Sequence, residues 1–490
     1  MKGNHTMKKK QRSSGILLAV SSLPSEYGIG SLGAPARRFV DFLHEAKQRY
    51  WQILPLVPTG EGNSPYMSPS AFAGSPYYID LDELAGEGLL APQELEAARY
   101  HSHDRVDFQW LHDTRIPLLK LAFARSQKLN QRRNSQIFLP WLGEYAHFAA
   151  LADKYGYPYE KWPKDAKPDK ETVEFHVFLQ TIFYRQWKNL KDYANEKGVL
   201  IMGDIPIYLS PQSAERWAKP KLFIQDKEGK LTKVAGVPPD AFTEEGQFWG
   251  NPLYDWENSK EALYDFWAER MEWCGEIYDC VRIDHFRAIH TYWEIPADAK
   301  SAKEGHWVEG PGMDFLEHLQ HSAPKLELVA EDLGDLDDDA LDFVRNCGID
   351  GMNVMVFAFD TNHESAYLPH NCRVDSVIYS GTHDTPTFVQ WFEESDEQSV
   401  QFATRYLRLR YDEGFSWGVI AGAWSSPSRL AIAPLQDVLG LSGDTRMNTP
   451  GTMGDHNWSW RVRAEAFNPF VSGKLKEFTQ TYCRDTGFQK

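Results

Sequence analysis

The chain has 490 residues and an apolar fraction of 42%, which is enough for a large buried core. Lys and Arg total 52 against 69 Asp and Glu, and the resulting formal net charge of -17 disfavours nucleic acids and anionic membranes as partners. The 5 cysteines are widely spaced and form no CxxC pair, so the sequence argues against a disulfide framework or a zinc site and favours a reducing compartment.

The N-terminal segment, residues 1–14, is predicted to be a disordered leader. The apolar run at residues 15–20 is too short for a membrane span, and the SSLPS that follows it is unlike a signal-cleavage pattern. We therefore predict a cytoplasmic protein.

Short apolar runs that end in Gly, Pro, Ser or Asp recur along the chain, and most are separated by enough residues for a crossover helix. No GxGxxG motif follows any of them, which disfavours a doubly wound nucleotide-binding sheet. Eight such strands close a (β/α)8 TIM barrel, an α/β fold. The predicted strands are residues 15–20, 51–56, 199–207, 278–283, 326–329, 352–357, 377–380 and 430–433.

Between these strands, apolar residues at spacings of three and four predict amphipathic helices at residues 34–49, 174–197, 259–273 and 395–410. Residues 15–490 are expected to form a single catalytic barrel. Two connections exceed what a barrel needs: residues 59–168 are predicted to be an inserted helical subdomain. Residues 210–258 contain AGVPPDAFTEEGQFWGNPLYDW, which fits neither helix nor strand and is predicted to be an active-site loop at the C-terminal face of the barrel.

Acidic residues recur at four predicted strand ends: Asp204, Asp284, the Glu331-Asp332 pair, and Asp384. Barrel strand ends converge at one face, so these side chains are expected to meet. When carboxylates are crowded, the pKa of one rises relative to the other, so one stays ionised while the other keeps its proton. Cleavage of a glycosidic bond needs one ionised and one protonated carboxyl group. The alternation of side chains along a strand does not decide which member of the Glu331-Asp332 pair faces inward, because the end of the strand is uncertain by a residue or two.

The segment VRIDHFRAIH places Arg282 two residues before Asp284, so both side chains share one strand face. The cation would keep the carboxylate ionised, as a nucleophile requires. Two simpler interpretations stand beside this one, a structural ion pair and, for any one strand-end acid, a helix N-cap. No metal site is predicted, because Arg282 would compete with a metal ion for the same acids.

The chain resembles the 4-α-glucanotransferases of the amylomaltase or disproportionating-enzyme type, glycoside hydrolase family 77 of the α-amylase clan. The resemblance covers nearly the whole chain. It is carried by GILLAVSSLPSEYGIGSLG, SPYMSPSAFAGSPYYID, GDIPIY, VAGVPPDAF, GQFWGNPLYDW, RIDHFRA, AEDLG, GTHDTPT and RMNTPGT.

This resemblance implies Asp284 as nucleophile, Glu331 as general acid and base, and Asp384 as the acid that stabilises the transition state. It implies a retaining transfer of α-1,4-glucan segments to the 4-hydroxyl of an acceptor glucan, with no cofactor. The partners would be maltooligosaccharides or fragments of starch or glycogen, and the enzyme would be a monomer or homodimer. Substrate-binding residues are expected at Tyr66, Asp204, Phe248, Trp249, Asn251, Trp256, Arg282, His383 and Asn448.

Aromatic residues of the 210–258 segment are expected to form a lid, because sugar rings stack their C–H faces on aromatic rings. The lid candidates are Phe242, Phe248, Trp249, Tyr254 and Trp256. Core packing remains an equal interpretation for Tyr254 and Trp256, and a structural role remains open for His383. Two rival functions also stay open: an α-glucan hydrolase of the α-amylase or α-glucosidase type, and a catalytically silent glucan-binding protein.

Overall fold

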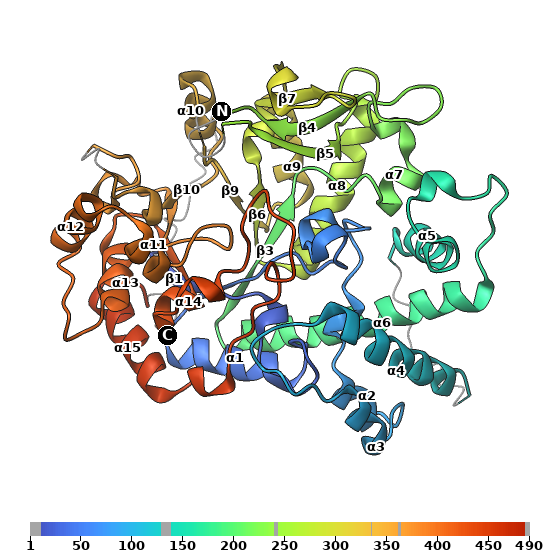
Figure 1. Cartoon of the computed structure of the whole chain (residues 1–490), viewed down its shortest axis with the longest axis horizontal. Coiled ribbons are helices and arrows are strands. Elements are labelled where there is room, and N and C mark those ends of the chain that lie inside the picture. The colour runs from blue at the N-terminus through green and yellow to red at the C-terminus, as the bar shows by residue number, and fades with distance from the viewer. Residues whose placement is uncertain (1–10, 129–138, 240–243, 335, 361–363, 486–490) are drawn as a thin grey trace, which may run out of the picture.

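The computed structural model describes residues 11–128, 139–239, 244–334, 336–360 and 364–485. Among these residues, eight parallel strands form one sheet in the order β10-β11-β12-β1-β2-β3-β6-β9. Its labelled strands, among them β1, β3 and β6, lie near the middle of Figure 1. The sheet closes where Val329 of β9 bridges Asp350, next to the start of β10. The TIM barrel and its eight predicted strands are confirmed. The strands are β1 (Ser13–Leu17), β2 (Tyr50–Gln52), β3 (Leu200–Pro206), β6 (Cys280–Asp284), β9 (Glu327–Ala330), β10 (Gly351–Val354), β11 (Ser376–Tyr379) and β12 (Leu430–Pro434).

The first strand begins earlier than the sequence indicated. Ser13 and Ser14, the last two residues of the expected leader, are buried in β1 and pair with Leu430 and Ala431 of β12. Residues 1–10 lie outside the described part of the chain. These two serines are polar, so the apolar pattern of the sequence did not place them in the strand. They belong to it because they pair with a strand far along the chain.

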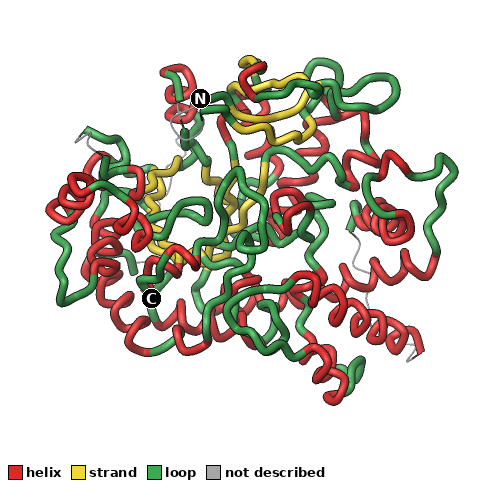
Figure 2. Tube along the Cα trace, viewed as in Figure 1, coloured by secondary structure: helices red, strands yellow, loops and turns green. Residues whose placement is uncertain are grey.

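The four predicted helices correspond to α1 (Ala34–Glu45), α6 (Lys170–Glu196), α8 (Lys260–Ile277) and α12 (Glu397–Tyr406). The first ends before its predicted limit at residue 49, because Lys47 adopts a left-handed φ of 58°. Helices surround the central strands, as Figure 2 shows in red around yellow. The others that follow the barrel strands are α9 (Gly312–Ser322), α10 (Asp338–Asn346), α11 (Phe388–Glu394), α13 (Phe415–Ser425), α14 (Leu435–Leu439) and α15 (Pro469–Thr481).

The 59–168 insertion carries α2 (Leu81–Gly86), α3 (Pro92–Leu95), α4 (Phe108–Lys128) and α5 (Leu142–Tyr155). It is joined to the barrel through α6, against which α4 and α5 pack. Two buried glutamines of α6 hold the insertion's backbone. Gln180 bonds the N–H and C=O of Gly74, and Gln186 bonds the N–H and C=O of Asp80.

The 210–258 insertion contains regular structure that the sequence analysis did not anticipate: α7 (Ala214–Ala218), β4 (Lys233–Val237) and β5 (Gln247–Pro252). These two strands join β7 (Thr291–Pro296) and β8 (His306–Glu309) in an antiparallel sheet of order β5-β4-β7-β8, which lies along the upper edge of Figure 1. The partner of β4 comes from beyond β6, so no local pattern could reveal the pairing.

The described helices include none that is both long enough and apolar enough to cross a lipid bilayer.

Candidate active site

Arg282 joins two carboxylates at the ends of neighbouring strands. The β3–β6 register sets Asp204 beside Arg282 and Pro206 beside Asp284. The Nη1 atom of Arg282 lies 2.9 and 2.8 Å from the two carboxylate oxygens of Asp204 and 2.9 Å from Oδ1 of Asp284. The exposed fractions are 4% for Arg282, 0% for Asp204 and 29% for Asp284. The predicted ion pair of Arg282 and Asp284 is therefore present, Asp204 shares the guanidinium, and Asp284 is the most exposed of the three side chains.

The charged groups of this cluster shift one another's pKa values. Burial lowers the pKa of Arg282, but Asp204 and Asp284 raise it more, so the guanidinium stays charged. Burial also raises the pKa of Asp204, against the opposing effect of Arg282. Arg282 thus occupies the position between the acids where a metal ion would have to sit.

Glu331 follows β9 and faces the same cluster. Its Oε2 accepts the backbone N–H of His285 at 2.7 Å, and its Oε1 accepts that of Leu333 at 3.2 Å. His285 adopts a left-handed φ of 54°, a conformation uncommon outside glycine, asparagine and aspartate. Burial raises the pKa of Glu331 to about 7, and Asp284 adds to this shift while Arg282 opposes it. Near neutral pH this carboxyl group therefore still carries a proton in a large fraction of molecules.

Of the Glu331-Asp332 pair, Glu331 is the acid that faces the site. The Oδ1 of Asp332 accepts the backbone N–H of Met352 at 2.6 Å, so this side chain is turned toward β10. Burial raises the pKa of Asp332 to about 6, although it lies apart from Asp284. Both acids have raised pKa values, so the pKa does not show which of them faces Asp284. Their hydrogen bonds do.

Asp384 follows β11 and is held ionised by two partners. His383 Nε2 lies 3.2 Å from its Oδ2, and Asn448 Nδ2 donates to its Oδ1 at 2.6 Å. Burial by itself would raise the pKa of Asp384, but His383 and Asn448 lower it to about 2. Arg446 also donates to the backbone carbonyl of Asp384. His383 therefore pairs with a site acid.

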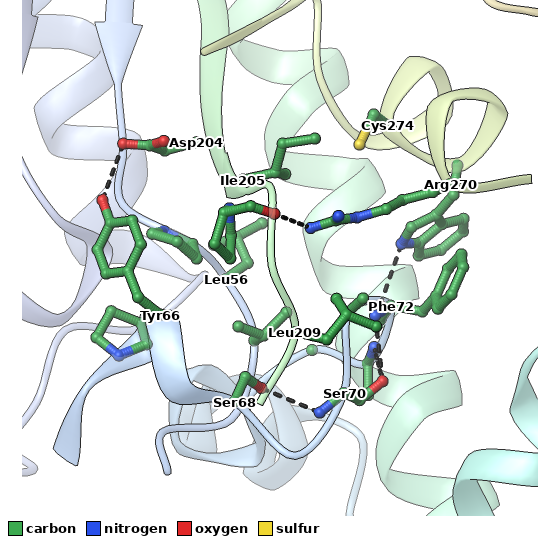
Figure 3. Close-up of a pocket in the computed structure, with 18 of the residues that line it drawn as sticks. Leu56, Tyr66, Ser68, Ser70, Phe72, Asp204, Ile205, Leu209, Arg270 and Cys274 are labelled. Atoms are coloured by element: carbon green, nitrogen blue, oxygen red, sulfur yellow. Dashed lines mark hydrogen bonds between the residues drawn. The ribbon is translucent and has the colours of Figure 1, made fainter. Parts of the chain in front are cut away.

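Tyr66 contacts both Asp204 and His383, the partner of Asp384. Its hydroxyl donates to Oδ2 of Asp204 at 2.9 Å, as Figure 3 shows, and its ring stacks on that of His383 with centroids 5.2 Å apart. Trp458, which the sequence analysis missed, lies against both rings at 5.5 and 6.0 Å. The signal available for Trp458 was its place shortly after RMNTPGT, the motif that supplies Asn448 and Arg446.

A small cavity of about 30 Å³ lies behind Tyr66 and Asp204, which is room for one or two water molecules (Figure 3). At its far side, Nη2 of the buried Arg270 donates to the carbonyl of Pro206, the last residue of β3, at 2.7 Å. Arg270 thus fixes the end of the strand that carries Asp204.

The expected lid residues occupy different environments. Trp249 packs edge-on against His285 at 4.8 Å, next to Asp284, and Phe248 is 44% exposed. Tyr254 is buried and donates to the carbonyl of Ile207 at 2.9 Å, so core packing is the correct interpretation for it. Phe242 lies outside the described residues.

Two further expected substrate-binding residues make structural contacts. Trp256 packs against Phe315 of α9 at 4.9 Å. Asn251 is buried, and its Nδ2 donates to the carbonyl of Leu209 at 2.8 Å. Asn251 belongs to β5, the strand that carries Phe248 and Trp249.

Comparison with known proteins agrees with this geometry. A family model described as 4-alpha-glucanotransferase matches residues 18–466. The 4-alpha-glucanotransferase of Clostridium butyricum is 39% identical over 484 residues, which cover 95% of this chain and 99% of that protein. The 4-alpha-glucanotransferase of Thermus thermophilus is 40% identical over 496 residues, which cover 96% and 98%.

A solved structure has the same fold throughout. The amylomaltase from Streptococcus agalactiae in complex with acarbose aligns with a TM-score of 0.92 and 36% identity, and the alignment covers 97% of this chain and 100% of that one. From the family model, these relatives and the site geometry together, we conclude that the chain belongs to the 4-alpha-glucanotransferases, glycoside hydrolase family 77.

Proposed function

We propose that the protein is a retaining 4-α-glucanotransferase that moves α-1,4-glucan segments from a donor maltodextrin to the 4-hydroxyl of an acceptor glucan or glucose, through a covalent glycosyl-Asp284. One observation carries the proposal. Asp284 is bound by the guanidinium of Arg282, whereas Glu331, which follows the adjacent strand β9, has a pKa of about 7. A retaining mechanism needs a carboxylate that can attack and, close to it, a carboxyl group that still carries a proton near neutral pH.

In the first step, Glu331 gives its proton to the glycosidic oxygen while the Asp284 carboxylate attacks the anomeric carbon, so the bond to the leaving glucan breaks. In the second step, the acceptor hydroxyl gives its proton to the Glu331 carboxylate and attacks the same carbon, which releases Asp284. The ionised Asp384 stabilises the positive charge that the sugar ring develops in each transition state.

The substrate would lie between two groups of side chains. Tyr66, Asp204, Arg282, His383 and Asn448 surround the acids and are proposed to bind the donor sugar at the cleaved bond. Phe248 and Trp249 are proposed to bind the acceptor, with Asn251 and Trp256 supporting them. Transfer prevails over hydrolysis when an acceptor sugar is better placed than water, and the aromatic wall beside Asp284 favours the acceptor.

Incubation with maltotriose tests the proposal. We expect glucose and a ladder of longer maltooligosaccharides, resolved by chromatography. Production of glucose and maltose alone would show a hydrolase instead, and the absence of any product would favour a glucan-binding protein.

The role of Asp284 is tested by Asp284→Asn. We expect this variant to lose transfer, because an amide is not a competent nucleophile, while maltodextrin affinity stays within about tenfold of the parent protein. Calorimetric titration with maltoheptaose measures the affinity. Transfer at the parent rate would remove Asp284 from the nucleophile role.

We also propose a cytoplasmic location and a monomeric or homodimeric state. The compartment is supported by the five cysteines, which are widely spaced in the sequence and form no CxxC pair. Cell fractionation and sedimentation velocity measure these two properties.

A further inference from the structure

A second pocket lies in the inserted helices, apart from the catalytic acids. It has a volume of about 170 Å³. Helix α5, the segment after it and the start of α6 supply most of its walls, and Pro69 supplies another. The residues that define it are Pro69, Tyr145, Phe148, Asp153, Tyr157 and His176.

The floor of this pocket is aromatic and buried. Phe148 is fully buried, and Tyr145 and His176 are buried beside it with ring centroids 6.4 Å apart. At the mouth, Tyr157 is 52% exposed and its ring lies 6.1 Å from that of Phe148. A ligand that enters therefore meets the exposed ring of Tyr157, which the buried aromatic floor supports.

One carboxylate at the mouth is positioned to accept hydrogen bonds. His176 Nε2 lies 2.9 Å from Oδ2 of Asp153 and so fixes the carboxylate. The Oδ1 atom has no hydrogen-bond partner among the described residues, and the side chain is 48% exposed. The pocket thus presents an oriented hydrogen-bond acceptor beside the exposed ring of Tyr157.

We propose that this pocket is a second binding site for a glucosyl unit of an α-glucan chain. Aromatic rings stack on the apolar C–H faces of a sugar, and a fixed carboxylate accepts hydrogen bonds from its hydroxyls. The choice of a glucan as ligand rests on the proposed function. It is supported by Pro69, which belongs to the same SPYMSPS segment as Tyr66, so the second site adjoins the segment that lines the catalytic site.

The site would hold long glucans while a distant part of the same chain reacts, which predicts an effect on long substrates only. We expect Tyr157→Ala to raise KM for long amylose chains about three- to tenfold, because one stacking ring is lost. Values of kcat and KM for maltotriose should not change. Asp153→Ala should act in the same direction, and Tyr157→Phe, which keeps the ring, should behave like the parent protein.

The matched control is Tyr155→Ala, which removes a neighbouring exposed tyrosine that does not line the pocket. Its kinetics should be those of the parent with both substrates. Thermal unfolding of each variant checks that the fold is kept.

An unchanged amylose KM in Tyr157→Ala, or an equal rise in Tyr155→Ala, would overturn the second site. The parent protein's product ladder from maltotriose separates this result from failure of the proposed function. If the ladder forms and the amylose KM does not respond, only the second site is wrong. In the Asp284→Asn background, calorimetry with maltoheptaose should find two sites, and Tyr157→Ala should remove one.

Discussion

Glu331 and Asp384 are two acids of one site with opposite protonation. The pKa of Glu331 is about 7 because burial outweighs the attraction of Arg282, whereas that of Asp384 is about 2 because His383 and Asn448 outweigh burial. The difference comes from hydrogen-bond donors and nearby charges, since both groups are carboxylic acids. The surroundings of each carboxyl group therefore decide that Glu331 serves as the acid and Asp384 as the anion.

This assignment predicts the alkaline limit of activity. Glu331 acts as an acid only when protonated, so kcat/KM should fall as the pH rises through about 7, the pKa of Glu331 in the free enzyme. Initial rates with maltotriose across the pH range measure the profile. A flat profile through pH 7 would contradict the role given to Glu331.

Substitution of the acid gives a second test at this scale. Glu331→Gln should lower the transfer rate about 10²- to 10⁴-fold, the usual contribution of a positioned proton donor. A donor with an activated leaving group, such as a glucosyl fluoride, needs no proton and should restore formation of the glycosyl-enzyme.

The neighbouring acid provides the control for that experiment. Asp332→Asn alters a residue that bonds the backbone of β10, so transfer should remain and rescue should be unnecessary. If Asp332→Asn instead reproduces the defect and its rescue, the two acids have been assigned the wrong way round.

At the scale of elements, the pairing of β3 with β6 brings Asp204 to Arg282. Gly203 precedes Asp204, and a Cβ atom there would lie 2.4 Å from the ring of Tyr278. We expect Gly203→Ala to lower the free energy of unfolding by about 1 to 3 kcal/mol, because overpacking forces the ring or the strand to move. Urea denaturation measures the loss, and activity should fall with it because Asp204 moves too.

The control for this change is Gly473→Ala on α15, where nothing lies within 4 Å of the added Cβ. Alanine favours a helix over glycine by about 0.5 to 1 kcal/mol, so this variant should be slightly more stable than the parent. A Gly203→Ala protein as stable as the parent would show that the ring of Tyr278 moves without cost.

At the scale of the whole molecule, α6 belongs to both the barrel and the insertion. It packs against α1 of the barrel and against α4 and α5 of the insertion. Its Gln186 satisfies both backbone groups of Asp80. We therefore expect the insertion and the barrel to unfold in one cooperative transition.

Gln186→Leu tests this coupling. The change leaves the buried N–H and C=O of Asp80 unpaired and should destabilise the protein by at least about 2 kcal/mol. Scanning calorimetry should show one transition at a lower temperature. Two separate transitions would contradict the coupling, and Gln401→Leu on the exposed face of α12 should have little effect.

Local patterns in the sequence were enough to predict the barrel and the location of its acids. Periodic apolar runs identified eight strands because strand and helix patterns are local, and Asp204, Asp284, Glu331 and Asp384 were found because barrel topology brings strand ends together. The β4–β5–β7–β8 sheet was not found, since its pairing joins segments on either side of β6.

The surroundings and orientation of each acid follow from the fold and could not be predicted from local sequence. The fold turned Glu331 toward Asp284 and Asp332 toward β10, and it placed Tyr254 in the core and Trp249 beside His285. These outcomes depend on desolvation and on hydrogen bonds from residues far apart in the chain. The ion pair of Arg282 and Asp284 could be predicted from the sequence. That Asp204 binds the same guanidinium could be seen only once β3 was paired with β6.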